Sequence, residues 1–183
     1  MSIVNTSLKY ALALSFLFTT TACGDEENHD NHEENHENHS SEENPHEEAC
    51  LHMQNGPSEA ITASAEKDLS ALPDATKEHT RVDITLVTGA DFGEDNGGYV
   101  RYEAEETGDY AIFVSADVAL EITDGDTAIA FEEEGEAVTE CTEVSVANLV
   151  ELEAGKSYQI KIGPTSETEV RLVIEHGEHE HEE

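Results

Sequence analysis

Apolar and polar residues alternate along most of the second two-thirds of the chain. A period of two places successive side chains on opposite faces of a strand, so each alternating run predicts a strand with one buried face. The apolar positions of these runs are Val82, Ile84 and Leu86; Val100, Tyr102 and Ala104; Tyr110, Ile112 and Val114; Val118, Leu120 and Ile122; Ile129 and Phe131; Val144, Val146, Val150 and Leu152; Tyr158, Ile160 and Ile162; Val170, Leu172 and Ile174.

Turn-forming residues separate these runs about every 8–12 residues, a spacing typical of antiparallel sandwiches. The turns are Gly97-Gly98, Gly108-Asp109, Asp124-Gly125-Asp126, Gly135, Gly155-Lys156 and Gly163-Pro164. We therefore predict an all-β fold, a single antiparallel β-sandwich of jelly-roll type, over residues 50–175. Residues 60–65 are expected to add an edge strand, and residues 67–72 one or two helical turns.

The alternation is absent before residue 50. Residues 24–48 contain 11 acidic residues and five His, with no Lys, Arg or large apolar residue. Such a segment cannot bury apolar surface to offset the entropy lost on ordering. We therefore predict a disordered tail over residues 23–49, and a second one over residues 176–183.

The amino-terminal end of the chain resembles a bacterial lipoprotein signal. Lys9 supplies positive charge, residues 10–18 are mostly apolar, and small residues 19–22 precede Cys23. The apolar run is shorter than the roughly 20 residues that a membrane-spanning helix needs. The resemblance implies a signal peptide over residues 1–22 and a lipid on Cys23. An ordinary secretory signal cleaved near Ala22 is the alternative.

The lipoprotein resemblance implies an address in the cell envelope, anchored by lipid in the outer membrane and facing either the periplasm or the surface. With Cys23 lipidated, Cys50 and Cys141 remain as an even pair in an oxidising compartment, which favours a disulfide between them. The formal net charge of −35 repels nucleic acid and anionic lipid and attracts cations, so we expect no nucleic-acid partner.

Both predicted tails are rich in His set among carboxylates. These residues are His29, His32, His36, His39 and His46 in the first tail and His176, His179 and His181 in the second. The first four follow steps of three, four and three, which would place them on one face of a helix. Neutral imidazole suits zinc, copper and nickel, and His-rich tracts indicate metal binding by composition. A solvated spacer between anchor and domain is the alternative.

Metal-capable side chains also occur where the tail meets the domain. Cys50, His52 and Met53 offer a thiol, an imidazole and a thioether, a set that favours cuprous copper, while Cys and His also favour zinc. The two thiols of Cys50 and Cys141 could make a four-ligand site with His52 and His79. A disulfide would remove both thiols and leave His52, Met53 and His79. A core role for Met53 and a structural role for His52 are the alternatives.

The second half of the chain, residues 97–175, resembles the bacterial pre-peptidase C-terminal domain. The resemblance is carried by Gly98-Tyr99-Val100-Arg101-Tyr102, Gly108-Asp109-Tyr110-Ala111-Ile112-Phe113-Val114 and Leu152-Glu153-Ala154-Gly155-Lys156-Ser157-Tyr158. That family is a β-sandwich, and the resemblance implies a non-catalytic accessory module that binds partners or surfaces, sometimes with calcium.

Calcium has one further sequence candidate, the loop over residues 89–98. Its oxygen-bearing residues are Asp91, Glu94, Asp95 and Asn96. Such oxygen ligands suit calcium, but their spacing does not match the EF-hand pattern, and a polar turn is the favoured interpretation.

The sequence favours a binding role over a catalytic one. It contains no G-x-S-x-G and no phosphate-binding glycine loop, so we expect no enzyme. The favoured function is that of a lipid-anchored extracytoplasmic protein that collects or buffers zinc or copper through its His/Glu-rich tails. The alternative is a surface-displayed, non-catalytic interaction or adhesion module whose acidic tail is only a solvated spacer.

Overall fold

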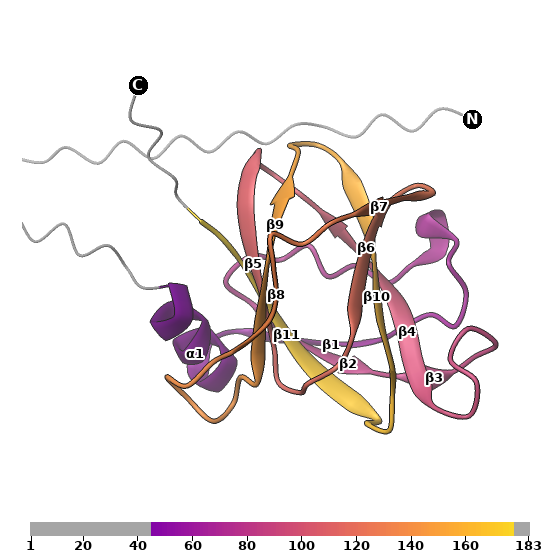
Figure 1. Ribbon diagram of the computed structural model, residues 1–183, viewed down its shortest axis with the longest axis horizontal. Helices are drawn as coiled ribbons and strands as arrows, with labels where there is room; N and C mark the ends of the chain where they lie inside the picture. Colours follow the sequence, from indigo (N-terminus) through magenta and orange to yellow (C-terminus); the bar gives the residue numbers. More distant parts are fainter. Residues whose placement is uncertain (1–44, 178–183) are drawn as a thin grey trace, which may run out of the picture. The chain divides into compact units, whose positions relative to one another are not determined.

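The computed structural model describes residues 45–177 (Figure 1). The predicted signal peptide, the predicted lipidation site Cys23 and most of both predicted tails lie outside the described residues. Six of the predicted metal ligands also lie outside them: His29, His32, His36, His39, His179 and His181.

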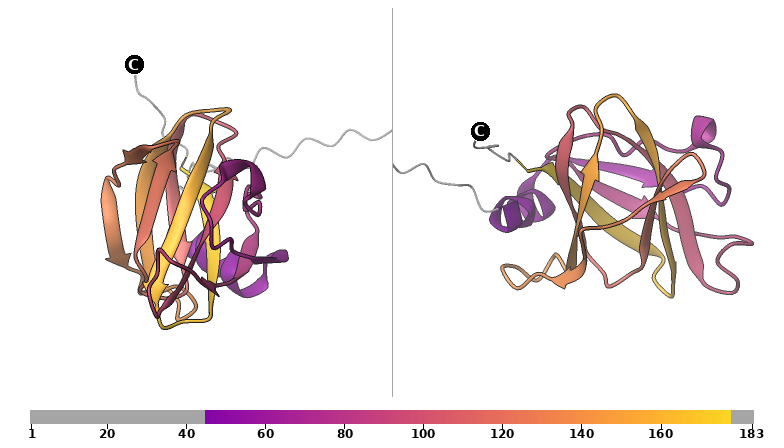
Figure 2. Two further views of the ribbon diagram at one scale, coloured as in Figure 1. Left: turned by 90° about the vertical axis from the view of Figure 1, so that its right-hand side faces the viewer. Right: turned by 45° about the horizontal axis from the view of Figure 1, so that its top comes forward.

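Two β-sheets face each other and form a sandwich, which confirms the predicted fold class (Figures 1 and 2). The six-stranded sheet has the order β1-β2-β11-β5-β9-β8, and the five-stranded sheet has the order β3-β4-β10-β6-β7. All pairings are antiparallel except the one between β1 and β2. The six-stranded sheet consists of β1 Ser58–Thr62, β2 Arg81–Thr85, β5 Gly108–Val114, β8 Glu133–Ala137, β9 Val146–Leu152 and β11 Glu169–His176. The five-stranded sheet consists of β3 Val87–Thr88, β4 Asn96–Glu103, β6 Leu120–Asp124, β7 Thr127–Ile129 and β10 Ser157–Thr165.

The core between the sheets is built from the predicted apolar positions. Ile84, Tyr102, Ile112, Ile162 and Leu172 are all fully buried there. Each large apolar side chain removed from water contributes about 1.5–3 kcal/mol to folding. This repeated contribution is why a period of two in the sequence is enough to predict which face of each strand points inward.

The edges of the six-stranded sheet differ in how well the sequence predicts them. The expected edge strand over residues 60–65 is β1, Ser58–Thr62, and the expected helical turn is the 3-10 helix η1, Leu69–Ala71. The other edge strand, β8, has no counterpart in the predictions, because Glu133–Ala137 reads Glu-Glu-Gly-Glu-Ala and all five residues are exposed. A strand without a buried face leaves no apolar period, and acidic residues are suited to an open edge.

A helix, α1 Pro45–Asn55, precedes the strands. The prediction of disorder through residue 49 is therefore wrong for residues 45–49. The predicted disordered tail over residues 176–183 is likewise wrong for His176, which is the last residue of β11. Proline is favourable at the first helical position, where its missing N–H costs nothing, and Glu47 and Glu48 suit the positive end of the helix dipole. Within residues 45–177, no helix is both long enough and apolar enough to cross a membrane.

α1 covers the outer face of the six-stranded sheet beside β11 (Figures 1 and 2). Ala49, Cys50 and Met53 are its buried positions, and they belong to one apolar cluster with Phe113, Val138, Val144, Ala147 and Val173. Phe113 and Val173 alternate along their strands with core residues, so they point away from the core and provide the surface on which the helix packs.

Two further connections hold α1 on the sheet. Cys50 is disulfide-bonded to Cys141 in the segment between β8 and β9, as predicted, and the bridge closes a loop with a sequence separation of 91. The Arg81 guanidinium donates from Nη1 to the Met53 carbonyl oxygen at 3.0 Å and from Nε to Asp83 Oδ1 at 2.9 Å. The carboxyl end of the helix is therefore tied to the start of β2.

Candidate metal centre

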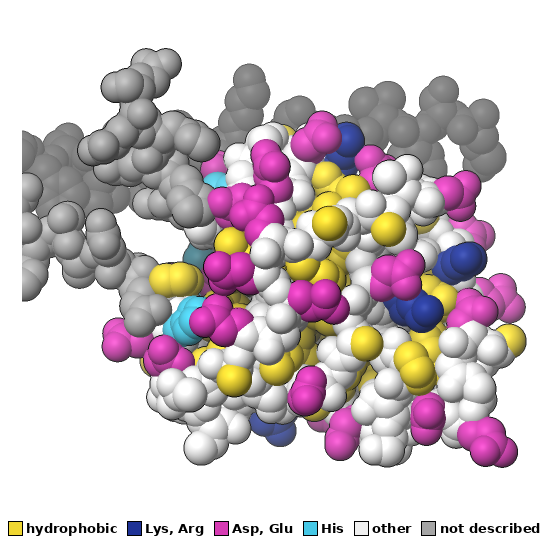
Figure 3. All heavy atoms as spheres, viewed as in Figure 1, with side chains coloured by type: hydrophobic (Ala, Val, Ile, Leu, Met, Phe, Trp, Pro, Cys, Tyr) yellow, Lys and Arg dark blue, Asp and Glu magenta, His cyan; other side chains and the backbone are white. Residues whose placement is uncertain are grey.

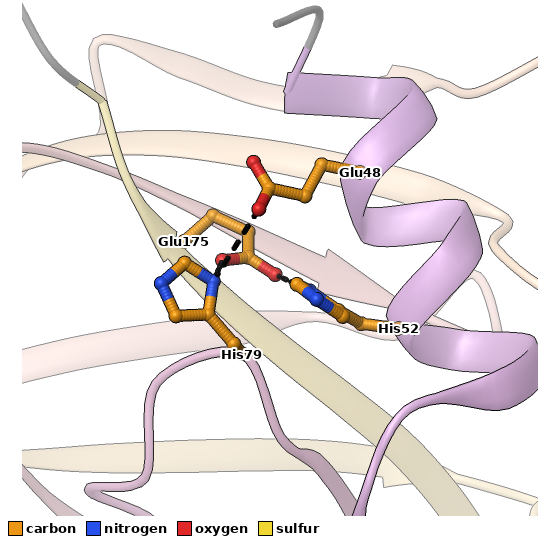
Figure 4. A group of neighbouring side chains, drawn as sticks. All are labelled: Glu48, His52, His79 and Glu175. Atoms are coloured by element: carbon orange, nitrogen blue, oxygen red, sulfur yellow. Dashed lines mark hydrogen bonds and ion pairs between the residues drawn. The ribbon is translucent and has the colours of Figure 1, made fainter. Parts of the chain in front are cut away.

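Four side chains from three separate elements meet beside α1 (Figure 4). Glu48 and His52 lie on α1, His79 lies in the turn before β2, and Glu175 lies on β11. One potential ligand atom from each residue lies within 4.8 Å of all the others. Glu48 and His52 are four residues apart, so the helix places them on the same face.

Glu175 is the buried centre of this group. Its side chain is 3% exposed, and its Oε1 lies 2.6 Å from Nδ1 of His52. Its Oε2 lies 2.7 Å from Nδ1 of His79, but this contact lacks hydrogen-bond geometry, so Oε2 has no hydrogen-bond donor. Burial raises the pKa of the Glu175 carboxyl above its ordinary value, against the opposing effect of the hydrogen bond and charge of His52. The only partner of Oε2 among the described residues is thus this ion-pair contact, and a cation could take both the carboxylate and the imidazole as ligands.

His79 forms the open side of the group. Its side chain is 57% exposed, and its Nδ1 lies 3.6 Å from Glu48 Oε1. Its ring lies 5.2 Å from the His52 ring, centroid to centroid. The backbone of His79 has φ +51°, a left-handed conformation that is uncommon for residues other than glycine and that concentrates at ligand sites.

The distances in this group fit a four-coordinate metal ion after small side-chain movements. Zinc binds His nitrogen and carboxylate oxygen at about 2.0–2.2 Å with tetrahedral geometry, which places ligand atoms about 3.3 Å apart. The short contacts to Glu175 would lengthen as an ion entered, and the wider ones would close. The described part of the chain thus contains a His/Glu cluster that could hold a metal ion.

His52 and His79 were both predicted as metal ligands, and the structure brings them together. The two carboxylates were not singled out, because the chain has 43 acidic residues and nothing local distinguishes Glu48 or Glu175 among them. The spacing of Glu48 and His52 by four residues is the one signal that could have identified a carboxylate, provided that a helix had been predicted there.

The other predicted ligands within the described residues lie elsewhere. Both thiols are consumed by the Cys50–Cys141 disulfide, so the alternative of a Cys-containing four-ligand site is wrong. Met53 is fully buried among apolar residues under α1, which is the core role. Nδ1 of His46 lies 3.5 Å from Oε1 of Glu140. The His176 ring lies 4.8 Å from the Tyr110 ring, centroid to centroid, with the two rings tilted. Neither His belongs to the four-residue group.

The loop over residues 89–98 behaves as a polar turn. The Asp91 carboxylate accepts a hydrogen bond from the Tyr99 hydroxyl at 2.6 Å, and Asn96 is the first residue of β4. Within residues 45–177, the acidic residues of this loop form no cluster of three close ligands.

The first predicted tail contains one further metal-ligand spacing. His32-Glu33-Glu34-Asn35-His36 matches the H-E-x-x-H pattern, in which two His one helical turn apart bind zinc. In a tract built almost entirely from His, Glu and Asn, composition alone produces such a match. The segment lies outside the described residues.

In comparisons with known proteins, no family model matches this chain and no curated protein matches it. The fold and the side-chain cluster therefore define its class: a disulfide-linked β-sandwich protein with a candidate His/Glu metal centre on the outer face of one sheet.

Proposed function

We propose that this protein is a lipid-anchored, extracytoplasmic metal-binding protein that collects or buffers zinc or copper. Its folded centre, formed by Glu48, His52, His79 and Glu175, holds one ion, and the His/Glu-rich tails collect further ions around it. The observation that carries the proposal is the buried Glu175 carboxylate, which lies between two imidazoles and has one oxygen without a donor.

The charge of the chain supports attraction of cations. Acidic side chains are spread over the face of the domain shown in Figure 3, and Lys and Arg are few there. A surface of one sign raises the local concentration of oppositely charged ions. The −35 net charge of the whole chain acts in the same direction.

The connection between tails and centre also supports the proposal. His46 precedes Glu48 by two residues, and His176 directly follows Glu175, so each His-rich tract joins the fold at an element that carries a ligand of the centre. A short covalent link gives the tethered ligands a high effective concentration at the centre. Ions released from either tract would therefore be released near it.

We expect two classes of affinity. A tail that must become ordered in order to bind loses part of its binding free energy to that ordering. The centre is already assembled by α1, β11 and the turn before β2, so it avoids this cost. The centre should take the first, tightest ion, and the tails should take several weaker ones.

The envelope location and the non-catalytic role are parts of the same proposal. The resemblance of residues 1–23 to a lipoprotein signal and the Cys50–Cys141 disulfide both support an oxidising compartment. A hollow of about 460 Å³ in the described residues includes none of the four residues of the centre.

Calorimetric titration of the full mature chain with zinc and with copper tests the proposal. Replacing His52 and His79 by Ala should remove the tightest binding class and leave the weak one. The matched control replaces His46 and His176 by Ala, which removes the same number of imidazoles outside the four-residue group. Equal tight binding by both double variants would refute the folded centre, and no zinc or copper binding by the unmodified chain would refute the function.

The alternative, a non-catalytic interaction module, is favoured by that same hollow. It lies over β4, β6 and β10 on the five-stranded sheet and is lined by polar side chains including Tyr99, Gln159 and Lys161. A protein or glycan partner that binds in the presence of chelator, and is lost on Gln159→Ala, would favour this second function.

A further inference from the structure

We infer that the folded centre is selective for a divalent, borderline cation such as zinc and discriminates against cuprous copper. This inference rests on the proposed function and deepens it, because the proposal leaves zinc and copper open. It follows from which ligand atoms the fold presents and from the charge that they carry.

The sulfur atoms near α1 are not available as ligands to the centre. Both thiols near α1 are joined in the Cys50–Cys141 disulfide, and Met53 is fully buried in the apolar cluster under the helix. Cys50 is two residues from His52, about 200° around a helix at 3.6 residues per turn, so the two side chains leave the helix on opposite sides. Cuprous copper prefers soft thiolate and thioether ligands, and the fold offers it none here.

The ligand atoms that remain are two imidazole nitrogens and carboxylate oxygens from two residues. This set suits zinc and the neighbouring divalent metals. Calcium takes six to eight oxygen ligands, and magnesium requires near-octahedral oxygen coordination. With two of its four residues contributing nitrogen, the centre is poorly matched to either hard cation.

The charge balance points the same way. Glu48 and Glu175 together carry two negative charges when ionised, and a divalent ion neutralises both. A monovalent cuprous ion would leave one negative charge uncompensated beside the Glu175 side chain, which is 3% exposed. An unpaired charge in a buried position is strongly unfavourable, so the buried carboxylate adds to the preference for a divalent ion.

The experiment compares zinc and cuprous copper on the full mature chain with its disulfide intact. Zinc affinity is measured by competition with a chromophoric chelator. Cuprous affinity is measured anaerobically with bicinchoninate, using a cuprous acetonitrile salt so that no thiol reductant opens the disulfide. Each measurement is repeated on His52→Ala/His79→Ala and on the control His46→Ala/His176→Ala.

We expect His52→Ala/His79→Ala to weaken the tightest zinc binding by about 100-fold or more, since loss of even a supporting residue of a metal site costs up to about that factor. The affinity for cuprous copper should change by less than about threefold, because the imidazoles of the tails, which the variant keeps, bind this ion. Cobalt(II) bound to the unmodified chain should show tetrahedral d–d absorption bands that the variant lacks.

The two proposals fail separately. A cuprous affinity that falls as steeply as the zinc affinity would overturn the selectivity and leave the metal centre standing. A zinc affinity unchanged in the variant would overturn the centre itself. Circular dichroism melting confirms that each variant is folded, and the closer-shaped His52→Gln/His79→Gln replaces any variant that is not.

Discussion

Replacing Glu175 by Gln separates the metal role of this residue from its structural role. The substitution keeps the shape of the side chain but removes its charge and one acceptor oxygen. In the metal-free protein two effects oppose each other: the cost of burying a carboxylate disappears, and so does the charge-assisted hydrogen bond with His52 at 2.6 Å. The remaining partners are imidazoles, and the Gln amide can donate to or accept from their ring nitrogens, so no ionised carboxylate is left buried. We expect the free energy of unfolding without metal to change by no more than about 1 kcal/mol.

The zinc-bound protein should behave differently. A ligand present at 100 times its dissociation constant stabilises the folded state by about 2.7 kcal/mol. For a domain of the size of residues 45–177, each 1 kcal/mol shifts Tm by about 3–5 °C, so zinc should raise the Tm of the unmodified protein by about 8–13 °C. In Glu175→Gln most of that shift should be lost, because the buried anionic ligand is gone.

Differential scanning calorimetry with and without zinc measures both quantities. The control is Glu140→Gln, because Glu140 also faces a His, with its Oε1 3.5 Å from His46 Nδ1, but lies outside the centre. If zinc raised the Tm of Glu175→Gln as much as that of the unmodified protein, Glu175 would not be a ligand and the reasoning from its buried carboxylate would be wrong.

Three further predictions concern the structure around the centre. Cys50→Ser/Cys141→Ser should lower the free energy of unfolding in urea by about 2–4 kcal/mol. It should also weaken zinc binding, because the disulfide holds α1, which carries Glu48 and His52. Unchanged zinc affinity would show that the apolar cluster alone positions the helix. Arg81→Ala should lower the free energy of unfolding in urea by about 1–3 kcal/mol, because its hydrogen bonds to the Met53 carbonyl and Asp83 are lost. Arg171→Ala should lower it by less, because the Arg171 Nε lies 3.7 Å from the same Asp83 Oδ1. Burial raises the pKa of Asp74, but hydrogen bonds from Thr76 and Arg101 outweigh it and leave the pKa below its ordinary value of 3.8. The ionised form therefore contributes stability at neutral pH that is lost as pH falls through the native pKa. In a plot of the urea unfolding midpoint against pH, Asp74→Asn should make the curve flatter over this acidic range. A curve parallel to that of the unmodified protein would contradict the assignment.

The strands could be predicted because the alternation of buried and exposed positions that stabilises them can be read from neighbouring residues in the sequence. Ile112 and Leu172 occupy alternate positions whose burial the period of two reveals without knowledge of their partners. α1 was not predictable in this way, since Ala49, Cys50 and Met53 are its only buried positions in an otherwise acidic sequence. Its stability comes from the disulfide and from contacts with strands far along the chain.

The carboxylates of the centre could not be predicted for a related reason. Glu175 follows core residue Ile174, so its side chain points to the outer face of the strand, where a polar residue is expected to be solvated. The helix and the turn before β2 bury it, and both are brought there by long-range packing. His52 and His79 were predictable because His is rare in the domain and its chemistry is specific.

The bridge between Cys50 and Cys141 also determines how the domain carries a mechanical load. A pull on the amino-terminal side can unwind residues 45–49 of the helix, which lengthens the chain by about 10 Å, before the bridge is drawn taut. Beyond that point the load divides, and one branch passes through Cys141 toward β9, an inner strand paired with β5 and β8. Because part of the load bypasses the chain between Cys50 and Cys141, the parallel edge strand β1 carries less of it than it would without the bridge.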